Sequence, residues 1–170
     1  VLKDKNIKIA LVSVDCIGLL ADFIKVVKER LEASEFEKRH VFIFSTHTHA
    51  GPDTMGLWGP LIGISGINKK YMNFLSDSIE KSVIDAEKDL KEADLYYSKG
   101  KIKGLIENYR KPEEINSEIH LLKFMTDNRL IASLWTYPAQ PEITDRDNLE
   151  VSGDYPGLVS GMIESEFRGI

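Results

Sequence analysis

The sequence predicts an α/β fold in which a mixed β-sheet is covered by helices. Residues 7–14 and 41–44 are apolar runs typical of central strands, and a helical pattern lies between them. This order indicates an N-terminal parallel β-α-β unit. The second half of the chain holds strand-like runs separated by short turns, which favour antiparallel pairing. A chain of 170 residues has the size of one domain, so we expect residues 1–170 to form a single domain.

The first part of the chain places two polar residues at one edge of the sheet. Residues 7–14 become continuously apolar toward their C-terminal end, as a central strand does. A helical stripe follows, made of Leu20, Ile24, Val27 and Leu31. If residues 41–44 form a strand parallel to the first, Asp15 and His47 emerge at the same sheet edge. For Asp15, a turn or helix-capping role and a role as metal ligand both stay open.

The later elements are expected to support the fold rather than to carry chemistry. The longest predicted helix covers residues 68–93, where one apolar stripe is flanked by lysines and acidic residues. Four strands should follow, at residues 95–98, 102–106, 118–125 and 130–137. The last two are predicted to form a hairpin through the turn at residues 126–128. A final helix is expected after Asp154, which is a candidate for its cap.

Composition excludes several classes of protein. The net charge of −5, without a cluster of Lys and Arg, argues against nucleic acid as a partner. The one cysteine, Cys16, allows neither an intrachain disulfide nor a cysteine-based zinc site, and we expect it to be a small buried hydrophobe. No apolar run is long enough to predict a membrane span. If no leader precedes Val1, we expect a soluble, cytoplasmic protein.

The most informative stretch is Thr46-His47-Thr48-His49, directly after the second predicted strand. If the extended conformation persists, His47 and His49 point to the same side, because strand side chains alternate with a period of two. Two imidazoles at a strand end are a plausible half of a metal site. On spacing alone, that interpretation and a pair of ordinary polar loop residues both stay open.

The loop at residues 51–66 is rich in glycine and proline and predicts irregular structure. It also carries apolar residues that a surface loop rarely collects, which are Leu57, Trp58, Leu61 and Ile62. We interpret it as a loop that packs over a pocket or an acyl chain. The alternative is a mobile surface loop.

The stretch Thr-His-Thr-His-Ala-Gly-Pro at residues 46–52 resembles the Thr-His-Thr-His-Ser-Gly-Pro signature of the neutral/alkaline non-lysosomal ceramidase family. Four further stretches resemble that family in the same order, at residues 11–19, 108–110, 137–141 and 152–157. The resemblance spans most of the chain and corresponds to an inner portion of the family's catalytic domain. It therefore implies that the natural protein is longer than this chain.

The resemblance implies a zinc-dependent hydrolase that cleaves an amide (N-acyl) bond of a small-molecule or lipid-like substrate. It implies that His47 is a ligand of Zn²⁺ and that His49 positions the substrate or its oxyanion. Arg110 is implied to hold the polar end of the substrate, and a forked, permanently charged donor suits that role. The remaining metal ligands and the catalytic serine of the family are implied to lie beyond residue 170.

Two positions depart from the family pattern. Gln140 stands where the family has a second zinc-binding histidine, and its amide oxygen suits zinc less well than an imidazole. Asp53-Thr54 stands where animal and secreted members have Gly-Gly. One alternative is a non-catalytic relative with a lost or altered metal site that acts as a binding module. The other, an amidohydrolase barrel, needs eight repeated units and further histidines, whereas only His120 follows His49.

Overall fold

The computed structural model describes residues 1–144 and 147–167, and these group into two compact units. Unit 1 comprises Val1–Leu90 and Pro141–Val159, and unit 2 comprises Lys91–Gln140 and the chain from Ser160. The expectation that residues 1–170 form one domain stays a prediction. Within the described residues, no helix combines the length and the apolar character that crossing a bilayer requires.

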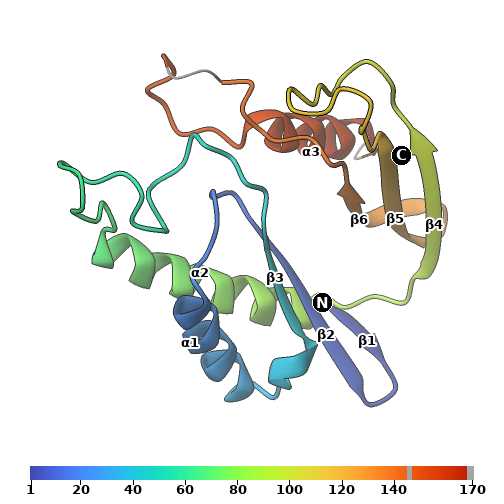
Figure 1. Cartoon of the computed structure of the whole chain (residues 1–170). Helices are drawn as coiled ribbons and strands as arrows, with labels where there is room; N and C mark the ends of the chain where they lie inside the picture. The colour runs from blue at the N-terminus through green and yellow to red at the C-terminus, as the bar shows by residue number, and fades with distance from the viewer. Residues whose placement is uncertain (145–146, 168–170) are drawn as a thin grey trace. The chain divides into compact units, whose positions relative to one another are not determined.

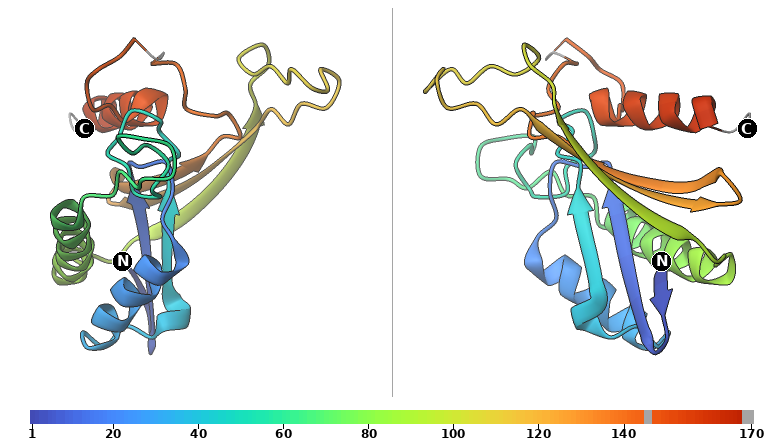
Figure 2. Two further views of the ribbon diagram at one scale, coloured as in Figure 1. Left: turned by 60° about the vertical axis from the view of Figure 1, so that its left-hand side comes forward. Right: turned by 90° about the vertical axis from the view of Figure 1, so that its right-hand side faces the viewer.

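Unit 1 is built on a three-stranded sheet in the order β1-β2-β3. Its strands and helices, in chain order, are β1 (Leu2–Asp4), β2 (Ile7–Val14), α1 (Ala21–Glu32), a 3₁₀ turn (Lys38–His40), β3 (Val41–Ser45) and α2 (Lys69–Lys88). β1 is antiparallel to β2, whereas β2 and β3 are parallel and run side by side in both views of Figure 2. Their register pairs Ala10 with Val41 and Val14 with Ser45. The predicted parallel pairing of these two strands is confirmed (Figure 1).

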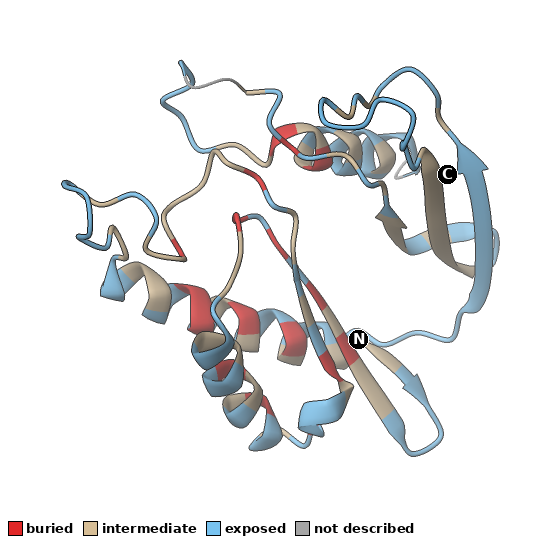
Figure 3. Ribbon diagram, viewed as in Figure 1, coloured by how far each residue is buried: buried red, intermediate tan, exposed pale blue. Residues whose placement is uncertain are grey.

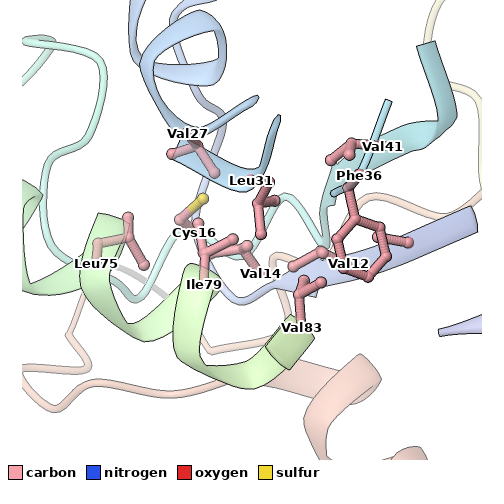
Figure 4. Close-up of a cluster of buried hydrophobic side chains, with 11 residues drawn as sticks. Val12, Val14, Cys16, Val27, Leu31, Phe36, Val41, Leu75, Ile79 and Val83 are labelled. Carbon is pink, nitrogen blue, oxygen red and sulfur yellow. The ribbon is translucent and has the colours of Figure 1, made fainter. Parts of the chain in front are cut away.

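The core of unit 1 lies between the sheet and its two helices. On β2, Ala10, Val12 and Val14 are buried, because alternate residues of a strand face the same side. The helices add Val27 and Leu31 from α1 and Leu75, Ile79 and Val83 from α2, and Phe36 and Val41 complete the cluster beside them (Figures 3 and 4). Each such side chain stabilises the fold by roughly 1.5–3 kcal/mol relative to leaving it in water. As expected, Cys16 belongs to this cluster and is fully buried.

The helices of unit 1 begin and end where local chemistry dictates. Asn68 is the N-cap of α2, and its side-chain oxygen accepts hydrogen bonds from the backbone N–H groups of Lys70 and Tyr71. The helix ends at Lys88, earlier than the predicted residue 93, because its buried stripe stops at Val83 and leaves little to hold a further turn.

Unit 2 holds an antiparallel sheet in the order β4-β5-β6. Its strands are β4 (Asp94–Lys101), β5 (Glu118–Thr126) and β6 (Arg129–Thr136), and β4 is long and visibly twisted in Figure 2. Asp127 and Asn128 join the last two strands with φ of 48° and 61°, as a two-residue hairpin turn needs. The predicted hairpin is confirmed. The helix α3 (Asp154–Phe167) starts in unit 1 and continues into unit 2.

Two sequence-based predictions about the sheets are wrong. We expected one mixed sheet, but the described strands form two separate three-stranded sheets. We also expected a strand at residues 102–106, whereas β4 ends at Lys101 and an irregular segment follows it. Gly104 has φ of 81°, and a left-handed backbone interrupts the ladder. The bond from the Ile102 N–H to the carbonyl of Ser117, at 2.9 Å, continues the register of β4 and β5 by one pair, and the irregular segment lies between these two residues.

Two neighbouring valines on α1 test the position of the core. Val27 is fully buried and Val26 is half exposed, so the same change should have different effects at the two sites. We expect Val27→Ala to lower the free energy of unfolding by about 2 kcal/mol, through lost burial and a residual cavity. Val26→Ala should change it by less than about 0.5 kcal/mol. Urea denaturation measures both, and equal effects would show that α1 packs through another face.

Candidate functional site

The candidate site lies where the loops after β2 and β3 meet, at the carboxyl ends of the two parallel strands. The N–H of Thr46 bonds to the carbonyl of Val14, and the N–H of His47 bonds to that of Cys16, each at 3.0 Å. The Thr46 hydroxyl donates to Asp15 Oδ1 at 3.0 Å. The expectation that Asp15 and His47 emerge at one edge is therefore confirmed. Asp15 does not cap α1, whose N-cap is Leu20 without a side-chain hydrogen bond.

His47 is held in a conformation that the strand pattern did not predict. The strand ends at Ser45, and His47 has φ of 68°, in the left-handed region. The argument from strand alternation is therefore wrong for this residue. Its ring is fixed by a 2.6 Å hydrogen bond between Nδ1 and the carbonyl of Ile17. Because a carbonyl only accepts, Nδ1 carries a proton, and in the neutral ring Nε2 then keeps its lone pair.

The two histidine rings nevertheless lie together. Their centroids are 5.1 Å apart and the planes meet at 81°, so one ring presents its edge to the other. His49 Nδ1 lies 3.5 Å from Glu142 Oε1, a residue that the sequence did not single out. The two residues of this contact lie far apart in the chain. The only feature of the sequence that pointed to Glu142 was its place two residues after Gln140.

The threonines around the histidines have structural roles. Thr48 is buried, and its hydroxyl donates to the carbonyl of Ser152 at 2.8 Å. The Ser152 N–H returns a 2.8 Å bond to the carbonyl of Ala50. Thr54, equally buried, donates to the carbonyl of Gly18 at 2.6 Å. These bonds tie the histidine segment to two other loops and so limit the movement of the rings.

Asp154 anchors a fourth segment to this region. It is buried with φ of 51°, and its Oδ2 accepts from the backbone N–H groups of Ile143 and Thr144 and from the Thr144 hydroxyl, each at 2.9 Å. Burial by itself would raise the pKa of Asp154. The hydrogen bonds from Thr144, Tyr155 and Ile143 outweigh burial and hold that pKa below its ordinary value. The carboxylate fixes the segment that carries Glu142, and α3 begins at Asp154 itself rather than after it as expected for a cap residue.

Arg110 and Gln140 belong to unit 2, whereas both histidines belong to unit 1. Arg110 is exposed in a turn built by Asn108, whose side-chain oxygen accepts from the N–H groups of Arg110 and Lys111 at 3.1 Å each. Gln140 is exposed at the end of unit 2. The structure brings His47 and His49 together, and the placement of Arg110 and Gln140 at the same site stays a prediction.

Comparison with known proteins decides the family. The family described as neutral/alkaline non-lysosomal ceramidase, N-terminal, matches residues 1–170, which is the whole chain. The chain belongs to this family. Neither a comparison with curated proteins nor one with solved structures found a match. Membership in the ceramidase family supports a ceramidase-like hydrolase and a lipid-like substrate, which agrees with the resemblance stated from the sequence.

The zinc ion expected in a ceramidase-like protein can be tested against the donors of this chain. His47 fits, because its Nδ1 donates to a backbone carbonyl and its Nε2 is left as a ligand, the usual arrangement of a metal-binding histidine. Within residues 1–144 and 147–167, no group of three or more His, Cys, Asp or Glu side chains forms a metal site. The fit therefore rests on His47 alone.

The low pKa of Asp154 predicts a dependence of stability on pH. Its charged form is the one that the fold stabilises, so the contribution is complete above the unfolded pKa of about 3.9 and is lost as pH falls through the lower folded value. We expect Asp154→Asn to lower the free energy of unfolding by about 1–3 kcal/mol at neutral pH, with a smaller difference in acid. Chemical denaturation from pH 7 to pH 3 measures this difference.

The exposed Asp4 on β1 supplies the matched control. Asp4→Asn should leave stability nearly unchanged at each pH. A deficit of Asp154→Asn that is the same at every pH would contradict the assignment of the effect to its charge.

Proposed function

We propose that this protein is a zinc-dependent, ceramidase-like amidase that cleaves the N-acyl bond of a lipid-like substrate. Family membership supports the class of reaction, and one contact supports the metal. That contact is the 2.6 Å hydrogen bond from His47 Nδ1 to the carbonyl of Ile17, which presents Nε2 as a ligand. Zinc, when bound, supplies a Lewis acid that polarises the amide carbonyl.

In this proposal His49 positions the substrate. Its ring meets that of His47 edge to face, with centroids 5.1 Å apart, so a group bound near His47 lies within reach of it. Glu142 Oε1, 3.5 Å from Nδ1, fixes the orientation of the ring through that edge. With a proton on both ring nitrogens, His49 donates from Nδ1 toward Glu142 and from Nε2 to the substrate oxygen that gains negative charge during attack. Glu142 acts through His49 and is a positioning residue.

Arg110 is proposed to hold the polar end of the substrate, as the family resemblance implies. The Asn108 turn supports this role because it fixes the backbone on both sides of the arginine through two hydrogen bonds of 3.1 Å. A fixed backbone with an exposed, permanently charged guanidinium suits paired hydrogen bonds to a carbonyl or carboxylate.

Gln140 decides between this function and a second one. If it replaces a histidine ligand, the site has one imidazole and an amide oxygen, which zinc binds less well than two imidazoles. A non-catalytic relative that keeps the fold and binds a lipid-like ligand is then the second candidate, and Gln140 is the feature that favours it. Metal content separates the two candidates.

Exchange of each histidine for alanine tests the ligand. We expect His47→Ala to lower the zinc content of the full-length protein at least tenfold, because it removes the imidazole ligand. His49→Ala should keep the metal and lose activity. His120→Ala, on β5 in unit 2, is the control and should keep both. Elemental analysis of purified protein measures the metal, and loss of zinc in His49→Ala but not in His47→Ala would reverse the assignment.

Replacement of Gln140 tests the second ligand. We expect Gln140→His to raise zinc affinity on the order of tenfold or more, because an imidazole is the better zinc donor. Gln140→Leu, of similar size but without a donor, should lower it. Competition with a fluorescent chelator measures both affinities. If the three proteins bind zinc equally, Gln140 does not lie at the metal.

A further inference from the structure

The segment from Met55 to Ile67 is a largely exposed apolar loop without a single charged residue. It leaves the candidate site directly after the histidine segment and leads to the N-terminal end of α2 (Figure 1). Ile62 is fully exposed and Trp58 is half exposed. Further large apolar side chains of the loop face solvent, namely Leu57, Leu61 and Ile64. A run of this kind on one surface element indicates a binding surface.

The apolar loop is held in shape by Asp53. Its Oδ1 accepts from the N–H groups of Met55, Gly56 and Leu57 at 3.0, 2.7 and 3.1 Å, and its Oδ2 accepts from Trp58 at 3.0 Å. Burial by itself would raise the pKa of Asp53. The four backbone hydrogen bonds outweigh burial and hold that pKa below its ordinary value. Asp53, which stands where animal and secreted members of the family have a glycine, therefore organises the loop.

Two glycines let the arms of the loop approach each other backbone to backbone. A Cβ on Gly59 would lie 1.4 Å from the carbonyl oxygen of Ile64, and one on Gly66 would lie 1.9 Å from that of Trp58. Only glycine fits at these two positions. The tip is a turn closed by a 3.0 Å bond from the Ile64 N–H to the Leu61 carbonyl, with Gly63 at φ of 84°. The arms and the turn together present Ile62 at the end of a defined structure.

We propose that this apolar loop docks on the surface of a lipid bilayer. Its composition matches that of an interfacial element, because an aromatic residue, Trp58, lies behind an uncharged aliphatic tip. The loop is followed by Lys69 and Lys70, which are exposed in the first turn of α2 and suit the phosphates of lipid headgroups. The net charge of −5 favours a zwitterionic surface over an anionic one.

Docking goes beyond the proposed hydrolysis, because it needs neither metal nor substrate. Docking would assist the reaction because the apolar loop begins a few residues after His49 in the same unit, so a docked loop keeps the candidate site near the bilayer. A lipid-like amide held in the bilayer would then enter the candidate site from the membrane surface. This last step rests on the proposed function, whereas the docking itself does not.

Vesicle binding of the full-length protein tests the proposal. The emission of Trp58 is obtained as the difference between the spectra of the protein and of its Trp58→Phe variant, so that other tryptophans, including Trp135, cancel. With phosphatidylcholine vesicles we expect a blue shift of Trp58 emission, quenching by brominated acyl chains and co-sedimentation of the protein. Ile62→Glu should weaken binding on the order of tenfold or more, because it places a charge at the inserted tip. Since Ile62 is fully exposed, the variant should keep its circular dichroism spectrum.

The control is Leu149→Glu, which makes a comparable change at an exposed site in the same unit and should leave vesicle binding unchanged. Unshifted Trp58 emission together with a protein that stays in the supernatant would overturn the proposal. The proposal would also be overturned if Ile62→Glu changed the oligomeric state and left vesicle binding unaltered. The apolar loop would then bind a second copy of the chain rather than a bilayer. His47→Ala should bind vesicles normally, which separates docking from the proposed zinc chemistry.

Discussion

The parallel pairing of β2 with β3 is the constraint on which the candidate site depends. It places the ends of two strands side by side, so that Asp15 and His47 leave the sheet at one edge. The pairing is held in register by burial, because Val12 and Val14 face the helices only in the observed alternation. A slip of one residue would turn these side chains to the opposite face of the sheet. The same strand register is therefore required both to bury the core of unit 1 and to bring the two site residues together.

Much of this arrangement could be predicted from the sequence, because apolar periodicity reports burial directly. The runs at residues 7–14 and 41–44 predicted both strands, and their parallel order followed from the intervening helix. Periodicity carries no information on where a ladder is interrupted. Ile102 and Gly104 lie in a strand-like run, yet the positive φ of Gly104 interrupts the strand directly after the last bond of the ladder, from Ile102 to Ser117. The number of sheets was equally beyond reach, because it depends on pairing between distant segments.

The candidate site was also predicted only in part from the sequence. His47 and His49 were found because they follow a strand, but their proximity arises from a turn rather than from strand alternation. Glu142 was missed because its contact with His49 joins two distant segments, one of which is fixed by Asp154. Asp53 was noticed only as a departure from a family pattern. Its four hydrogen bonds to successive backbone N–H groups explain that departure as a device that shapes a loop.

The left-handed backbone of His47 has a consequence for how this protein balances stability and function. A residue with a Cβ pays roughly 1–2 kcal/mol to adopt this conformation, and glycine does not. Glycine at position 47 would remove this backbone strain, whereas the protein carries the large imidazole ring of His47 there. Such a residue contributes through its imidazole and not through its conformational fit. A glycine at position 47 would relieve the backbone but would also lose the ring and its hydrogen bond to the carbonyl of Ile17, so the two effects on stability oppose each other.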